Sequence, residues 1–263
     1  MQVGYLISNQ KRLFYILHKA TEFQHVILYI PPFAEEQNKS RAMISQTAKT
    51  FAKAGQSVLM LDLYATGDSQ GLLQTATWQD WLQNINDAVL WLQQQGFQEI
   101  SLWGLRLGCL LISDYLLTST FQFKQLLFWQ PILKGKLFLK QFLRLKVAAE
   151  MSSKNPPTVK KLQIQLEQTG ELEIAGYLIN QSLAQSIEMA LLEQTNLTFI
   201  GQLNWFEINP NATLSPASQK IIAAWQEDYQ CSITSQSITA EPFWLTQEMT
   251  IAHKLKQQSM DVF

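Results

Sequence analysis

The sequence has few cysteines and almost no net charge, and each shortage excludes a class of protein. Cys109 and Cys231 are the only two cysteines in 263 residues. They lie far apart without metal-ligand spacing, so we expect reduced thiols, no metal site and no cofactor. Twenty Lys and Arg residues are balanced by 21 Asp and Glu, for a net charge of −1. Because a nucleic-acid binder needs a basic surface to neutralise phosphates, we expect no nucleic-acid partner.

Long apolar runs are also missing. No stretch approaches the roughly 20 apolar residues that a membrane-spanning helix needs, and residues 1–12 do not have the pattern of a signal peptide. We therefore expect a cytoplasmic protein. Hydrophobic residues make up 47% of the chain and charged residues 16%, which is enough apolar material for one large core. The length fits a single α/β domain over residues 1–263.

Apolar strands alternate with amphipathic helices along most of the chain. An antiparallel pair at 3–7 and 12–18 opens the sequence. Buried strands are predicted at 25–30, 57–63, 100–103, 125–129, 203–208 and 232–238. Helices are predicted from 38 or 40 to 54, and at 78–95, 105–117, 218–229 and 245–256. This alternation predicts a mostly parallel central sheet flanked by helices, with ligand sites at the carboxyl ends of the strands.

Residues 132–201 interrupt the alternation with mostly helical sequence, and we interpret them as a cap-like insertion or lid. Within 115–149 there is no acidic residue and there are six basic ones. Three interpretations of this basic segment remain open. It can be a helix with a solvated basic face, a lid over an apolar pocket, or a peripheral membrane contact through 134–147.

Two glycine-containing motifs predict the fold more specifically. Gly104-Leu105-Arg106-Leu107-Gly108 lies between a predicted strand and a predicted helix, which is the arrangement of a nucleophile elbow. One helix upstream, residues 62–71 (DLYATGDSQG) are similar to the Asp-x-x-Gly-x-Gly-x-Ser-x-Gly loop of α/β-hydrolases, with the first glycine replaced. The order and spacing of the two motifs predict an α/β-hydrolase fold.

Longer stretches resemble the exosortase A system-associated hydrolases, most closely the second type. They are residues 31–41 (PPFAEEQNKSR), 102–108 (LWGLRLG), 141–151 (QFLRLKVAAEM), 174–177 (IAGY) and 241–244 (EPFW). The resemblance implies the α/β-hydrolase fold. It also implies a bacterial setting in which exopolysaccharide genes and PEP-CTERM protein-sorting genes occur together.

The residues of a classical Ser-His-Asp triad are missing from their usual places. Arg106 takes the position of the serine, and a guanidinium cannot be deprotonated to attack an acyl group. The loop after the last predicted strand, residues 239–244, lacks the usual histidine, and the three histidines are His18, His25 and His253. The acid position offers Glu207 or Asn209. We therefore do not expect classical serine hydrolysis.

Arg106 has two possible roles. It can bind an anion at a helix N-terminus, or it can pair with a carboxylate of the protein and hold loops together. The candidate carboxylates are Glu35, Glu36 and Asp68. The candidate ligand-binding residues are Arg106, Leu105, Asn38, Lys39, Phe33 and Trp244, and Ser40 is a further possible donor.

Two functions follow from these roles. The first is a non-classical hydrolase, in which Glu35, Glu36 or Asp68 positions water, with Glu207 as a further candidate. The second is a pseudo-enzyme that binds a small acyl, carboxylate or phosphate ligand, or a partner protein.

Overall fold

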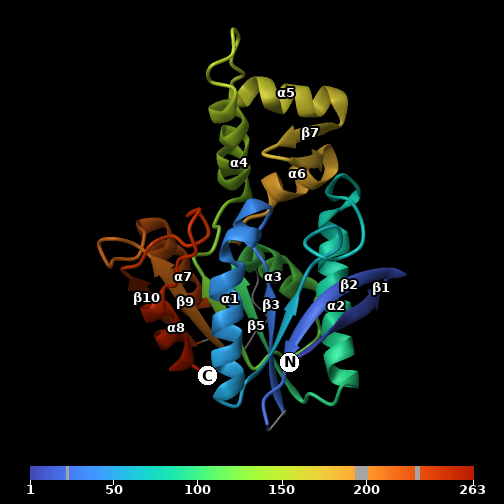
Figure 1. Cartoon of the computed structure of the whole chain (residues 1–263). Coiled ribbons are helices and arrows are strands. Elements are labelled where there is room, and N and C mark those ends of the chain that lie inside the picture. The colour runs from blue at the N-terminus through green and yellow to red at the C-terminus, as the bar shows by residue number, and fades with distance from the viewer. Residues whose placement is uncertain (22–23, 193–200, 229–231) are drawn as a thin grey trace.

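A computed structural model describes residues 1–21, 24–192, 201–228 and 232–263. Its centre is an eight-stranded sheet with the order β1-β2-β4-β3-β5-β6-β9-β10 (Figure 1). The strands are β1 (Gln2–Ser8), β2 (Lys11–His18), β3 (His25–Ile30), β4 (Ser57–Leu61), β5 (Glu99–Leu105), β6 (Gln125–Trp129), β9 (Gln202–Ile208) and β10 (Ser232–Ile238). β2 runs antiparallel to both β1 and β4, and the six strands from β4 to β10 are parallel. This confirms the predicted mostly parallel sheet.

Helices cover both faces of the sheet, and the sheet divides the core into two layers. α1 (Glu35–Lys53) and α8 (His253–Met260) pack on one face. α2 (Trp78–Gln94), α3 (Leu107–Thr118) and α7 (Pro216–Asp228) pack on the other. All six residues of β3 are buried, as expected for a central strand with helices on both sides. The N-terminus of α2 is fixed by a capping box between Thr77 and Asp80.

The insertion forms a cap that projects above the carboxyl ends of the strands (Figure 1). It consists of α4 (Gly135–Ala149), α5 (Val159–Thr169), β7 (Glu171–Ile174), β8 (Tyr177–Asn180) and α6 (Gln181–Met189). The β7–β8 hairpin departs from the mostly helical prediction. Ala175 and Gly176 both have positive φ, as a two-residue turn of this type requires, and Glu171–Ile174 alternates exposed and buried residues. Residues 193–200 of the predicted insertion lie outside the described residues.

Two predicted helices begin three or more residues away from their expected start. α1 begins at Glu35 rather than at Asn38 or Ser40, because Ala34 adopts φ 54° and turns the chain directly into the helix. The last helix was predicted at 245–256 but begins at His253. Before it, the Thr246 and Thr250 hydroxyls both donate to the carbonyl oxygen of Glu248. Such local side-chain hydrogen bonds compete with helix formation.

Candidate active site

Arg106 occupies a strained turn between β5 and α3. Its backbone has φ 55° and ψ −116°, a conformation that non-glycine residues rarely adopt. The two elbow glycines allow α3 to approach the sheet closely. A Cβ atom at Gly108 would lie 2.3 Å from the carbonyl oxygen of Ile30, and one at Gly104 would lie 2.8 Å from the backbone of Cys109. The chain therefore keeps the backbone of a nucleophile elbow with arginine at its tip.

The Arg106 side chain forms an ion pair with Glu36, in the first turn of α1. Nη2 and Nε of Arg106 lie 3.0 and 3.2 Å from Oε1 of Glu36, and Nε lies 3.3 Å from Oε2. Only 13% of the Arg106 side chain and 14% of the Glu36 side chain are exposed. Burial raises the pKa of Glu36, and the attraction of Arg106 opposes the rise. The guanidinium also lies over the ring of Trp244, with its carbon 5.3 Å from the ring centroid.

The Arg106 guanidinium, paired with Glu36, lines a cavity of about 350 Å³ between the carboxyl ends of the strands and α4. We call it the Arg106 cavity. Its lining comes from the loop after β3 and the start of α1, the elbow, α4 of the cap, and the segment after β10. The lining residues are Phe33, Glu35, Glu36, Lys39, Arg106, Phe138, Gln141, Phe142, Leu145, Trp244 and Leu245. Four of the predicted ligand-binding residues therefore line the same cavity as the Arg106–Glu36 pair: Phe33, Lys39, Arg106 and Trp244.

The basic segment contributes α4 to this cavity. Phe138, Leu139, Phe142 and Leu143 are buried, whereas Leu137 and Leu145 are exposed. Phe33 of the sheet edge packs against Phe142 with ring centroids 5.1 Å apart. Mixed exposure beside a cavity is the pattern that favours a lid among the three interpretations.

Tyr177 of the cap was not predicted as a site residue, yet it joins the cap to α1. Its hydroxyl donates to Glu35 Oε2 at 3.0 Å and accepts from Asn38 Nδ2 at 2.8 Å. Burial and the neighbouring Glu35 carboxylate raise the pKa of Tyr177 to about 12. A second cavity of about 230 Å³ lies beside this contact, with Ala34, Asn38, Gly67 and Tyr177 in its lining. The sequence signal for Tyr177 was its place in a family-like stretch, which carries no information about a contact with Glu35.

Several candidate residues need correction. Asp68 does not reach Arg106. Its side chain is 65% exposed and lies 3.9 Å from Arg41, while the buried Asp62 organises the loop by accepting from Gln37 Nε2 and the Asp68 backbone N–H. Leu105 is fully buried in the core and does not line the cavity, because its strand position points it under α1.

Of the four polar candidates on α1 and β9, three are engaged elsewhere and one lines the Arg106 cavity. Asn38 lines the second cavity and not the Arg106 cavity. Lys39 lines the Arg106 cavity and donates to the carbonyl oxygen of Leu245 at 3.3 Å. Ser40 is buried and donates to the carbonyl oxygen of Gln37. Glu207 is buried and accepts from Trp205, from the Ser215 N–H and from the Ser218 hydroxyl, and so holds the start of α7.

The three histidines lie away from the elbow. His18 is the last residue of β2, on the antiparallel side of the sheet, and burial lowers its pKa. His25 is the first residue of β3 and lies at the amino ends of the parallel strands, whereas Arg106 lies at their carboxyl ends. His253 is exposed at the first turn of α8. The loop after β10 instead brings the buried Phe243 and Trp244 to the site.

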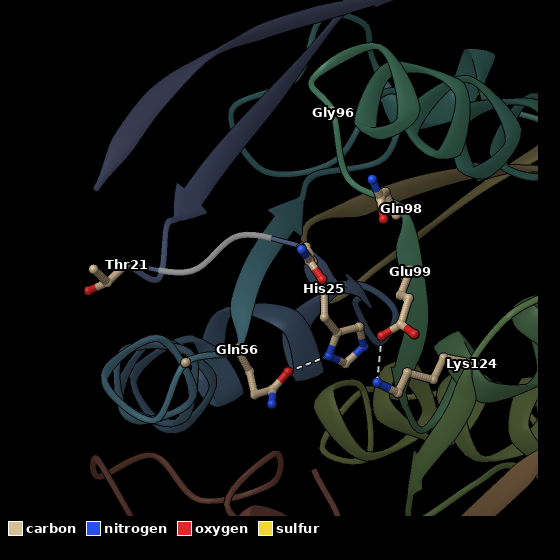
Figure 2. A pocket seen from close by; sticks show the side chains of 9 residues that line it. Thr21, His25, Gln56, Gly96, Gln98, Glu99 and Lys124 are labelled. Carbon is tan, nitrogen blue, oxygen red and sulfur yellow. Dashed lines mark hydrogen bonds and ion pairs between the residues drawn. The ribbon is translucent and has the colours of Figure 1, made fainter.

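A larger cavity of about 600 Å³ lies at the amino ends of the parallel strands (Figure 2). Figure 2 shows the His25 ring directed toward Gln56, with Glu99 paired to Lys124 at 2.5 Å. The second ring nitrogen of His25 lies 2.8 Å from the Ser101 hydroxyl, and burial lowers the His25 pKa. Parallel sheets bind ligands at their carboxyl ends, so the smaller Arg106 cavity is the better candidate.

Across the described ranges, no group of three or more His, Cys, Asp or Glu side chains is arranged to hold a metal ion. Cys109 is buried and free, and burial raises the pKa of its thiol well above the usual value; Cys231 lies outside the described residues. Within those same ranges, no helix has the length and apolar character to cross a membrane.

Solved structures similar to this chain share one fold. The sequence itself matches no family model and none of the curated proteins. The esterase Est1E from Butyrivibrio proteoclasticus, with ferulic acid bound, aligns with a TM-score of 0.66 at 14% identity over 98% of this chain and 96% of that one. Mouse α/β-hydrolase domain-containing protein 10 aligns with a TM-score of 0.64 at 14% identity over 100% and 98% of the two chains. The α/β-hydrolase GrgF from Penicillium sp. sh18 gives 0.64 at 14% identity over 99% and 96%. Likeness at these identities carries the fold and no activity: the chain has the α/β-hydrolase fold.

Proposed function

We propose that this protein is a pseudo-hydrolase that binds a small acyl or monocarboxylate ligand in the Arg106 cavity. One observation carries the proposal. The residue at the tip of the elbow is an arginine that pairs with Glu36 and lines a largely apolar cavity. An elbow serine acts because its hydroxyl stands next to a histidine base, and neither group is at this place in the described structure. In this proposal the protein binds a ligand at the place of the nucleophile elbow and does not carry out classical serine hydrolysis.

The charges of the cavity define the ligand class. Lys39 and Arg106 carry two positive charges, and Glu35 and Glu36 carry two negative ones, so the lining is neutral overall. A phosphate would bring up to two negative charges to a guanidinium that is already paired. An acyl carbonyl or a single carboxylate brings at most one negative charge. The aromatic and aliphatic residues Phe33, Phe138, Phe142 and Leu145 would cover its apolar part.

A second candidate is non-classical hydrolysis with Glu36 as the general base. Glu36 is favoured because it lines the cavity, its pKa is raised by burial and Arg106 beside it can stabilise negative charge. Glu35 is held by Tyr177, and Asp68 lies away from the cavity. Glu36 is therefore the strongest of the proposed carboxylates.

The cellular setting is a further part of the proposal. The resemblance of residues 31–41 and 102–108 to exosortase A system-associated hydrolases supports a cytoplasmic role beside exopolysaccharide and PEP-CTERM systems. Membrane contact through 134–147 has less support, because four of the apolar residues of α4 are buried. We favour the lid role for α4.

Two assays separate binding from catalysis. A fluorophosphonate probe should leave the protein unlabelled, and p-nitrophenyl esters should not turn over. Decanoate should bind in isothermal titration calorimetry, with affinity reduced about tenfold or more by Arg106→Met. Phe142→Ala should also weaken binding, whereas Lys140→Met, at a residue of α4 that does not line the cavity, serves as the control. Ester turnover that is lost in Glu36→Gln would establish the second candidate, and serine labelling would refute both.

A further inference from the structure

β1 is an outer strand of the eight-stranded sheet and lies at its margin in Figure 1. Proteins usually protect such an edge with charged residues, proline, a bulge or a short strand, because unpaired backbone groups recruit other strands. β1 has none of these: its seven residues, QVGYLIS, include no charge and no proline, and they pair with β2 without interruption. The residues of β1 therefore supply none of the usual protective features.

The hydrogen bonds of β2 establish which backbone groups of β1 face outward. The backbone of Arg12 bonds in both directions to Gln70, and the backbone of Phe14 bonds to Ser69 and Asp62, on the side away from β1. Ile7 and Tyr5 are the residues of β1 opposite Arg12 and Phe14. In an antiparallel ladder, residues opposite such positions also direct their N–H and C=O groups away from the pair. Val3, Tyr5 and Ile7 therefore present donors and acceptors to the outside.

The same three residues carry exposed apolar side chains. Val3, Tyr5 and Ile7 are 52%, 52% and 63% exposed, whereas Leu6 on the opposite face is 2% exposed. The Tyr5 ring packs against Phe14 of β2 with centroids 5.7 Å apart. Open hydrogen-bonding groups and exposed apolar side chains therefore coincide on one edge.

We propose that β1 pairs with β1 of a second copy of this chain, antiparallel, with Tyr5 on the two-fold axis. In this register Tyr5 is opposite Tyr5 of the other copy, and Val3 is opposite Ile7 in both directions. Every pair then matches outward-facing backbone groups with one another, for about six hydrogen bonds across the interface. The two sheets become one continuous sheet of the dimer.

Charge favours a second copy as the partner. β1 brings no charge to the interface, so two copies meet without repulsion in the strands that pair. The nearest cation, Arg12, stacks over Tyr5 and is opposite Ile7. The two-fold axis places the two Arg12 residues toward opposite ends of the interface, about 14 Å apart along the strands alone. The facing apolar pairs of this register, Tyr5 with Tyr5 and Val3 with Ile7, would stabilise the antiparallel strands.

Sedimentation velocity and light scattering on the full chain test the dimer. We expect a species of twice the 30.1 kDa chain mass that dissociates on dilution. Tyr5→Lys should raise the dissociation constant by about tenfold or more, since it sets two like charges opposite each other. Leu117→Lys, at a residue of α3 with 47% exposure, is the matched control and should leave the dimer unchanged. Circular dichroism checks that both variants fold.

Oxidative cross-linking tests the register. Tyr5→Cys should form a disulfide-linked dimer, because hydrogen-bonded partners place their Cα atoms about 5.5 Å apart, within disulfide range. Val3→Cys alone should not cross-link, since the two copies of residue 3 are about 14 Å apart along the strands. A mixture of Val3→Cys and Ile7→Cys proteins should form the mixed disulfide. The parent chain under the same oxidant gives the background.

Three results would overturn the proposal. They are a monomeric parent at every concentration, a Tyr5→Lys dimer as tight as the parent dimer, and cross-linking by Val3→Cys alone but not by Tyr5→Cys. If the parent forms a dimer but Val3→Cys cross-links and Tyr5→Cys does not, the interface lies elsewhere or uses another register. None of these measurements depends on ligand binding, so failure of the dimer leaves the proposed function untouched.

Discussion

Replacing Arg106 by methionine tests whether the buried ion pair exists and how much it stabilises the fold. Methionine keeps an apolar stem and removes the partner of Glu36. Glu36 would then be left 14% exposed with an unpaired charge, a change that destabilises proteins by about 3–5 kcal/mol. The carboxyl group can instead take up a proton. That route costs about 1.36 kcal/mol for each pH unit above its ordinary pKa of 4.5, or about 3.4 kcal/mol at pH 7.

The pH dependence makes the prediction specific. A carboxyl group whose folded pKa is raised contributes stability that is present at low pH and is lost as pH rises from the unfolded pKa through the folded one. The loss in Arg106→Met relative to the parent should therefore be smaller at pH 5.5 than at pH 7. Its upper limits are about 1.4 kcal/mol and about 3.4 kcal/mol, because the raised pKa of Glu36 in the parent already carries part of this cost. Urea unfolding at several pH values, followed by tryptophan fluorescence, measures both numbers.

A double variant is the control for this prediction. Arg106→Met with Glu36→Gln carries no buried charge and should recover most of the stability lost at pH 7, with no pH dependence from this pair. The ion-pair reasoning is refuted if the single variant loses less than about 1 kcal/mol at pH 7, or if its loss is the same at pH 5.5. It is equally refuted if the double variant is no more stable than the single one.

Three further changes test other parts of the structure. Gly108→Ala places a methyl group 2.3 Å from the Ile30 carbonyl oxygen, so thermal unfolding should show a loss of about 3 kcal/mol or more; a loss under 1 kcal/mol would contradict the close approach of α3. Asp62→Ala strips the acceptor from Gln37, Arg41 and the Asp68 N–H, and we expect about 3 kcal/mol of destabilisation with faster proteolysis in loop 64–71. Tyr177→Phe removes the hydroxyl between Glu35 and Asn38, so amide exchange in β7 and β8 should quicken while the global stability changes by only about 1 kcal/mol. Unchanged exchange would show that the hydroxyl does not hold the cap.

The sequence determined the architecture because its strongest signals are local. The apolar run 26–30 of β3 and the helical spacing of residues 78–95 each restrict a short segment, and the alternation of such segments predicts a parallel sheet. The spacing of Gly104, Arg106 and Gly108 placed the elbow for the same reason. The helix expected at 245–256 begins only at His253, because hydrogen bonds from Thr246 and Thr250 outweighed an apolar pattern before it.

Only the tertiary structure decided which groups meet at the site. Glu35, Glu36 and Asp68 were equal candidates as partners of Arg106, and their sequence positions did not distinguish them. α1 begins at Glu35, so its first turn directs Glu36 to Arg106 and Glu35 to Tyr177 of the cap, while the loop around Asp62 carries Asp68 to Arg41. These are contacts between residues 70 and 142 positions apart. Sequence periodicity specifies the face on which a residue lies, and packing of distant elements specifies what that residue touches.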